Sequence, residues 1–198
     1  MNKFEVNDLE IPDVKLITHK CYYDNRGYFS EIYNADALSE LGIIDGIVQE
    51  NYTINHRGVV RGLHCQLSPY AQGKMVRCVK GKIFDVAVDV RQGSPWFGKW
   101  LSIELSEDDA KIVWIPVGFL HGFCALEDKT IVEFKCTGPW KLEYERGVIW
   151  NDSHLNINWP IPNDEIIVSE RELVRNDFSA VNNWFRYSPE TVNCSPQQ

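Results

Sequence analysis

Short apolar runs, separated by turn-forming residues, recur through the middle of the chain. Nine of them follow one another: IVQENYTIN, GVVRGLHCQ, KMVRCVKG, KIFDVAVDV, WLSIELS, KIVWIPVGF, HGFCALE, TIVEFKCT and GVIWND. Glycine, proline, asparagine and aspartate divide them at roughly ten-residue spacing, which is typical of an all-β sandwich, jelly roll or barrel. In IFDVAVDV, apolar residues stand at both odd and even positions around Asp85 and Asp89. This pattern predicts a strand that is buried on both faces, with an acidic side chain that points inward or lies at the rim of the fold.

The segment LITHKCYYDNRGYFSEIYN, which precedes these runs, predicts two strands joined by the turn DNRG. This turn brings Arg26, Phe29 and Glu31 near one another. Helices are few and short in this sequence.

Two short helices are predicted, one on each side of the strand region. The first covers residues 36–41 and is closed by Gly42. The second covers residues 169–176, with Ser169 as N-cap and Glu172 at the third helical position.

A chain of 198 residues, 44% of them hydrophobic, is long enough for one well-buried domain. We expect that domain to cover residues 1–185, and the polar tail 186–198 to be mobile or draped on a neighbour. The net charge of −8 argues against sequence-independent nucleic-acid binding, which needs a basic face.

The six cysteines form no CxxC pair, and most lie in apolar runs where a free thiol acts as a small hydrophobe. The N-terminus is polar, without the apolar region of a signal peptide, and no run of eighteen apolar residues occurs. We therefore expect a cytoplasmic protein with reduced thiols and no membrane span.

The stretch 57–89 carries the most informative chemistry. Arg61 stands three residues before His64, and Lys74 ten residues after it. On the strands of a closed barrel, these three side chains can meet in one cavity. A neutral imidazole can take a proton from a carbon beside a ketone, and an ammonium group can stabilise the enolate oxygen.

A base of this kind is expected to have a carboxylate partner that orients the imidazole. The sequence offers Asp85, Glu133 and Glu172. A structural role remains open for each site residue: His64 as a satisfied core histidine, and Lys74 as a solvated hairpin residue.

A metal site is disfavoured by the lysine in this stretch. The segment Pro116–His121 keeps the PxGxxH form of metal-binding double-stranded β-helix proteins, but His64-Cys65-Gln66 lacks their HxH, and Lys74 would repel a cation. His121 has two equally good explanations: a structural histidine that hydrogen-bonds the backbone of a turn, or a residue that contacts the substrate.

Several motifs, in order and spacing, resemble the dTDP-4-dehydrorhamnose 3,5-epimerase family. They are LIT…DNRGYFSE, RGVVRGLHCQ, QGKMVRCVKGKIFDVAVDVRQGSPWFGKW, WIPVGFLHGFCAL and YERGVIWND, and the resemblance runs from about Pro12 to Leu173. It implies an all-β, cupin-type jelly roll with a few short helices. It also implies a cofactor-independent, metal-free homodimer with an N-terminal strand exchanged between subunits.

The resemblance further implies roles for individual residues. His64 would be the general base, Lys74 would hold the keto oxygen and enolate, and Glu172 would back the histidine in place of the family's aspartate. The implied substrate contacts are Arg26, Phe29 and Glu31 of the DxRGxFxE segment, Gln49 and Asn51 of the QxN motif, Arg61 near the pyrophosphate, and His121.

One wall of the implied site departs from the family. The family pattern YKxTxYY begins with a tyrosine, the general acid, thirteen residues after the HGF histidine, where this chain has Phe134. Phenylalanine cannot donate a proton. The tyrosine pair further along becomes Pro139-Trp140, so the wall formed by Phe134 and Trp140 is altered.

These observations leave three functional hypotheses. The first is an epimerase of a nucleotide-linked 4-keto-6-deoxy sugar that inverts carbon 3, with inversion at carbon 5 left open. The second is the standard 3,5-double epimerase. The third is a weakly active or inactive sugar-nucleotide-binding protein. The sequence does not distinguish dTDP, CDP and GDP as carriers, and surface polysaccharide synthesis is one destination of the product.

Overall fold

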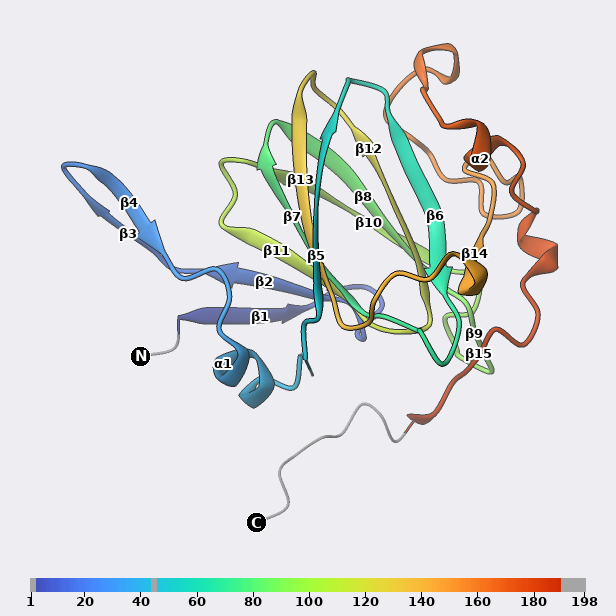
Figure 1. Ribbon diagram of the computed structural model, residues 1–198, viewed down its shortest axis with the longest axis horizontal. Helices are drawn as coiled ribbons and strands as arrows, with labels where there is room; N and C mark the ends of the chain where they lie inside the picture. The colour runs from blue at the N-terminus through green and yellow to red at the C-terminus, as the bar shows by residue number, and fades with distance from the viewer. Residues whose placement is uncertain (1–2, 44–45, 190–198) are drawn as a thin grey trace.

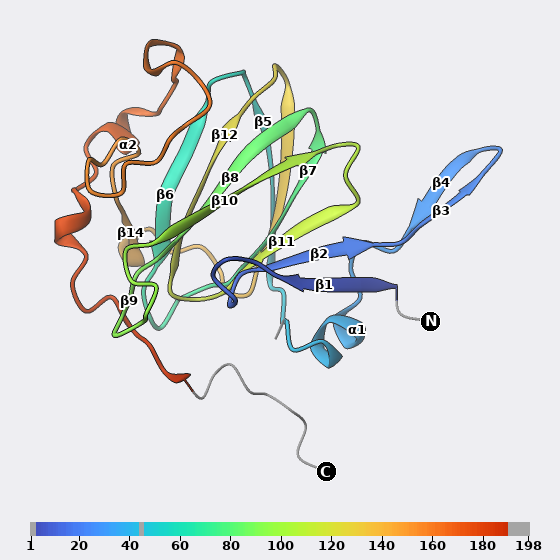
Figure 2. The same cartoon turned by 180° about the vertical axis from the view of Figure 1, so that it is seen from behind.

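The computed structural model describes residues 3–43 and 46–189, and most of its regular structure is β-strand. Two sheets face each other (Figures 1 and 2). The larger sheet has the strand order β1-β2-β11-β7-β13-β5, and the smaller has β10-β8-β12-β6-β14. Their strands are β1 (Phe4–Asp8), β2 (Lys15–His19), β5 (Gln49–Asn55), β6 (Val60–Gln66), β7 (Lys74–Lys80), β8 (Lys82–Asp89), β10 (Trp100–Ser106), β11 (Lys111–Ile115), β12 (Phe119–Ala125), β13 (Thr130–Cys136) and β14 (Glu145–Gly147).

Two small pairs of strands lie outside these sheets. The predicted hairpin is confirmed as β3 (Cys21–Asp24) and β4 (Gly27–Ser30), which project from the body of the molecule (Figure 1). The strand β15 (Phe185–Arg186) spans the boundary between the predicted domain and the predicted tail, and it runs parallel to β9 (Arg91–Gln92). Residues 190–198 of that tail lie outside the described residues.

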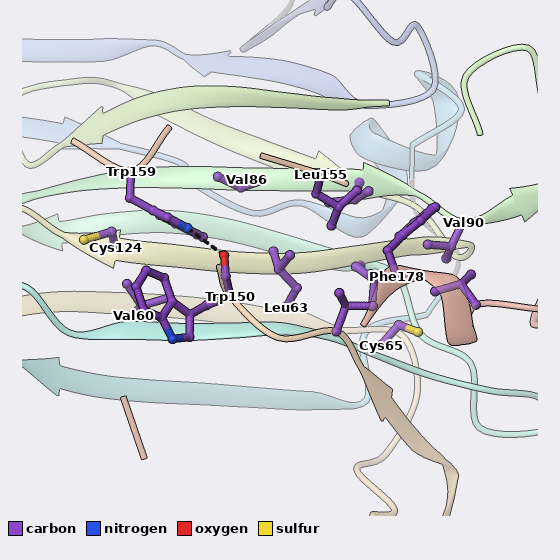
Figure 3. Close-up of a cluster of buried hydrophobic side chains, with 14 of the residues drawn as sticks. Val60, Leu63, Cys65, Val86, Val90, Cys124, Trp150, Leu155, Trp159 and Phe178 are labelled. Carbon is purple, nitrogen blue, oxygen red and sulfur yellow. Dashed lines mark hydrogen bonds between the residues drawn. The ribbon is translucent and has the colours of Figure 1, made fainter. Parts of the chain in front are cut away.

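The smaller sheet is covered on both faces, which explains the double apolar pattern of β8. Ile83 and Ala87 pack between the two sheets, whereas Val86 and Val88 belong to a cluster on the opposite face. Figure 3 shows part of this second cluster. There Trp159, from the C-terminal segment, donates a hydrogen bond of 2.9 Å from its indole to the carbonyl of Trp150.

The prediction of a strand at GVIWND is wrong beyond Gly147. Its last residue, Asp152, is buried and organises a turn instead. Its carboxylate accepts hydrogen bonds from the backbone N–H groups of His154, Leu155 and Phe178 at 2.8 to 3.0 Å. Because a carboxylate that satisfies three N–H groups fixes the chain locally, this segment folds back over the smaller sheet.

The first predicted helix is confirmed as α1 (Ala35–Glu40), capped by the Asn34 side chain. The second is shorter than predicted: α2 covers only Glu170–Leu173, and the Ser169 side chain makes no capping bond. Glu172 binds Arg175 rather than closing a capping box. Neither α-helix has the length or the apolar run that a membrane crossing requires.

Replacing Asp152 by alanine is expected to destabilise the protein by roughly 3 kcal/mol, because buried N–H groups lose a charged acceptor. Urea unfolding followed by circular dichroism would measure the change. Asp164→Ala, an exposed carboxylate in the same C-terminal segment, is the control and should unfold close to wild type. Equal midpoints for the two variants would contradict this role of Asp152.

Candidate active site

A cavity of about 310 Å³ opens between the two sheets and collects most of the residues that the sequence singled out. The residues that line it are Gln49, Asn51, His64, Gln66, Gln72, Lys74, Phe134, Trp140 and Glu145. Larger cavities exist, one of about 390 Å³ beside Trp114 and one of about 690 Å³ under the β3–β4 hairpin. We regard the smaller cavity as the candidate site because an imidazole, a buried ammonium and a carboxylate converge in it.

Strand alternation explains how these side chains reach one cavity. On β6, Leu63 and Cys65 belong to the outer cluster, whereas His64 and Gln66 line the cavity. On the facing sheet, Phe134 of β13 stands opposite Asn51 of β5. Successive residues of a strand point to opposite faces. The register of β6 therefore determines both which side chains enter the outer cluster and which line the cavity.

The environment of His64 favours the neutral imidazole. Burial, followed by the positive charge of Lys74, lowers the pKa of His64 well below its ordinary value. Its Nδ1 atom is buried and has no hydrogen-bond partner among the residues that the structure describes. The neutral imidazole is the form that accepts a proton at neutral pH.

Lys74 is only 4% exposed, although it carries an ammonium group. In the described part of the chain it makes no hydrogen bond and no ion pair. Burial lowers the pKa of Lys74, while nearby Cys136 and Cys65 oppose the effect. The buried, unpaired ammonium makes this cavity suited to an anionic oxygen.

Among the residues that the structure describes, no carboxylate is hydrogen-bonded to His64, and the backing role expected of Glu172 stays a prediction. The Glu172 carboxylate instead accepts a bond of 3.2 Å from Arg175 Nε. Asp85 lies 2.7 Å from Nε2 of His121, and both are buried. His121 is thus held by an acid and does not line the cavity, although its Cα is paired with that of His64 across the two strands.

The third candidate acid, Glu133, is engaged elsewhere. Arg77 and Lys135 bind its carboxylate at 2.8 to 3.0 Å. Burial alone would raise the pKa of Glu133, but these two cations lower it to about 2. Glu133 therefore serves a surface ion-pair network rather than the base.

The structure does not bring Arg61 into the cavity with His64 and Lys74, which corrects that expectation. Its side chain is exposed, and its Nε donates a bond of 2.7 Å to Asn55. A substrate contact by Arg61 stays a prediction.

The three residues of the DxRGxFxE segment also lie away from this cavity. Arg26 pairs with Asp24 at 2.5 Å, and Glu31 pairs with Lys3 at 2.7 Å. Phe29 is 70% exposed on the projecting hairpin. Within one chain, these side chains do not converge on the base.

Sequence reasoning missed three residues of the cavity, Gln66, Gln72 and Glu145. Gln66 shares the face of His64 two positions along β6, so strand parity could have revealed it. Its amide donates to the carbonyls of Tyr70 and Pro139 and so holds the loop that carries Trp140. Glu145 follows a 3₁₀ turn and had no motif to mark it.

Glu145 connects the cavity to the C-terminal segment. Its carboxylate accepts bonds from the Trp140 indole at 3.0 Å, from Arg171 at 2.5 Å, and from Arg175. Burial alone would raise the pKa of Glu145, but these bonds and the two guanidinium charges lower it. Glu145 is therefore an ionised carboxylate that fixes Trp140 at the wall of the cavity.

The arrangement suits proton abstraction from a carbon acid. His64 comes from the smaller sheet, and Lys74 comes from the larger sheet that faces it. The residues described form no cluster of three or more His, Cys, Asp and Glu side chains that could hold a metal ion. Phe134, which lines the same cavity, offers no proton.

Comparison with known proteins agrees with these features. The sequence pattern of the dTDP-4-dehydrorhamnose 3,5-epimerase family matches residues 8–179. The Shigella flexneri dTDP-4-dehydrorhamnose 3,5-epimerase is 45% identical over 165 residues, covering 83% of this chain and 90% of that protein.

Solved structures give the same assignment. The dTDP-6-deoxy-D-glucose-3,5-epimerase of Legionella pneumophila, in complex with dTDP-4-keto-L-rhamnose, has a TM-score of 0.88 at 36% identity and covers 93% of this chain and 99% of its own. A 3'-monoepimerase from Streptomyces bikiniensis, in complex with dTDP-quinovose, has a TM-score of 0.81 at 28% identity and covers 87% of each chain.

The expected cupin-type fold is confirmed by these structural neighbours. The length of the family match and the identity to the Shigella protein confirm the resemblance that the motifs indicated. The chain belongs to the dTDP-4-dehydrorhamnose 3,5-epimerase family and is a nucleotide-sugar epimerase.

Proposed function

We propose that this epimerase inverts carbon 3 alone of a dTDP-linked 4-keto-6-deoxy sugar. The observation that carries the proposal is a cavity with a neutral base and an ammonium group, lined by Phe134 at the position where the resemblance to the family implies a tyrosine acid. The carrier is inferred from relatives, because the Legionella and Streptomyces enzymes were both solved with dTDP-sugars.

The reaction begins at His64. Its neutral imidazole removes the proton from carbon 3, which is acidic because it lies next to the ketone at carbon 4. The electron pair of the C–H bond moves into an enolate, and the Lys74 ammonium stabilises its oxygen. Return of a proton to the opposite face of carbon 3 completes the inversion.

Two alternatives are weaker. The 3,5-double epimerase is favoured by the names of relatives such as the Shigella enzyme. It needs efficient proton return at two carbons, and Phe134 cannot donate a proton at either. An inactive binding protein has no use for a buried ammonium beside a neutral imidazole, since burying a charge without a partner costs stability.

We also infer a homodimer, with the β3–β4 hairpin reaching the partner subunit. Tyr23, Tyr28 and Phe29 are 60 to 78% exposed on that hairpin. Exposed aromatic side chains that gather on one projecting element are typical of protein interfaces. In such a dimer, Arg26 and Phe29 would serve the cavity of the partner.

The thiols support a reducing compartment. The five cysteines in the described residues form no disulfide, and four of them are buried. Cys194 lies outside those residues. A cytoplasmic location agrees with unpaired thiols, since disulfides are rare in that compartment.

His64→Ala is expected to abolish exchange of the carbon 3 proton, because no other neutral base lines the described cavity. The measurement is deuterium uptake from heavy water into dTDP-4-keto-6-deoxyglucose, followed by NMR at carbons 3 and 5. His56→Ala, an exposed histidine, is the control. Activity within a few-fold of wild type in His64→Ala would place the base elsewhere.

The same measurement on the wild-type protein separates the three hypotheses. Uptake at carbon 3 with single inversion is the expected result. Uptake at both carbons with a doubly inverted product would contradict the mono-epimerase. Uptake at neither carbon, with dTDP-, CDP- and GDP-linked sugars, would contradict an active enzyme.

Phe134→Tyr is expected to raise the inversion rate or to add inversion at carbon 5, because it restores a phenol to the wall of the cavity. Product configuration by NMR is the measurement, and Phe134→Leu controls for the altered shape of the wall. An unchanged product spectrum in Phe134→Tyr would show that residue 134 does not occupy the position of the acid.

The double variant Tyr23→Glu/Tyr28→Glu is expected to be monomeric in sedimentation velocity, because charges replace the exposed aromatic surface. Val174→Glu changes an equally exposed apolar residue away from the hairpin and should leave the dimer intact. A wild-type protein that is monomeric at micromolar concentration would contradict the inferred dimer.

A further inference from the structure

An epimerase needs a proton donor on the face opposite its base, and Phe134 cannot be that donor. The other residues that line the cavity narrow the choice. The amides of Gln49, Asn51, Gln66 and Gln72 and the indole of Trp140 are not acids at neutral pH. Glu145 is ionised, because the hydrogen bonds from Trp140 and Arg175 and the charges of Arg175 and Arg171 lower its pKa in spite of its burial. Lys74 remains as the protonated group.

The position of Lys74 agrees with this role. His64 lies on β6 of the smaller sheet, whereas Lys74 and Phe134 lie on neighbouring strands, β7 and β13, of the larger sheet. Phe134 of β13 is paired with Val76 of β7. Lys74 lies two residues before Val76 on β7, opposite Cys136. Such diagonal neighbours on one face of a sheet are close enough for a long side chain to bridge. Lys74 therefore approaches the cavity from the larger sheet, as a tyrosine at position 134 would, whereas His64 approaches it from the smaller sheet.

We propose that Lys74 is the general acid of this enzyme and delivers the proton that completes inversion at carbon 3. This inference rests on the proposed function. His64 takes the proton from carbon 3, and the electron pair forms the enolate. As the enolate reverts to the ketone, its carbon 3 takes a proton from the Lys74 ammonium, the N–H bond breaks, and its electron pair stays on nitrogen. Solvent water then removes the proton from His64 and returns one to Lys74.

The surroundings of Lys74 suit a group that gives up a proton. Burial lowers the pKa of Lys74, which makes the ammonium a stronger acid than an exposed lysine. The titratable groups whose charges act on Lys74 are Cys136 of β13, Cys65 of β6, Glu145 of β14 and Asp85 of β8, and the charge of Lys74 in turn acts on His64. Lys74 has no ion-pair partner in the described chain that would have to be broken before the transfer.

Lys74→Arg separates charge from proton donation, because a guanidinium keeps its charge but does not deprotonate in proteins. In heavy water, we expect the variant to incorporate deuterium at carbon 3 within about tenfold of the wild-type rate, and to lose inversion by on the order of a hundredfold or more. Lys80→Arg, on the exposed end of the same strand, is the matched control and should invert at the wild-type rate.

The double variant Lys74→Arg/Phe134→Tyr supplies a second donor and should recover inversion. Inversion by folded Lys74→Arg at the wild-type rate would overturn the inference and leave the proposed function intact. Absence of exchange in the wild-type protein would instead contradict the proposed function.

A measurement on the wild-type protein covers the case in which Lys74→Arg does not fold. The number of inversions per exchange event should fall as the pH rises through the pKa of Lys74, which burial places below its ordinary value of 10.5. Below that pKa the ammonium is present and the ratio should be constant. A ratio that stays constant from about pH 6 to about pH 11, beyond the ordinary pKa of a lysine, would overturn the assignment.

Discussion

The burial of an unpaired ammonium between two sheets is the constraint on which the site depends. Lys74 is 4% exposed and has no carboxylate bound to it in the described chain. Such a group costs stability unless something compensates for its desolvation. Its charge, after burial itself, is the main reason that the pKa of His64 lies so low. One residue thus keeps the base neutral and presents a positive charge to the developing enolate.

The packing on both faces of the smaller sheet supports this arrangement. The segment organised by Asp152 covers the outer face, so that Leu63 and Cys65 are buried there while His64 turns inward. The same C-terminal segment carries Arg175, which binds Glu145 and thereby the wall formed by Trp140. Stability and site geometry are consequently coupled: loosening the cover would release both the base strand and the wall.

The carboxylates show how tertiary contacts redistribute similar side chains. Three acids were candidates for orienting His64, and each binds a different cation or imidazole. Asp85 holds His121 in the interior, Glu133 joins a surface network, and Glu172 supports Arg175. The imidazole of His64 is left with a buried, unpartnered Nδ1, so its orientation depends on packing and on whatever binds in the cavity.

The sequence by itself determined the strand pattern, the hairpin and the first helix, because strand alternation and turn residues are local properties of the chain. It also placed His64 and Lys74 in one cavity. Gln49, Asn51, Phe134 and Trp140 were expected there because of the resemblance to the family, and they line the same cavity. Only the tertiary structure decided which partners the charged groups have. Glu145 is thirty residues from Arg175, and a contact at that separation depends on distances that no local pattern encodes. Glu172 and Arg61 have partners three and six residues away, but only the folded chain shows that these partners, and not His64, are the groups they bind.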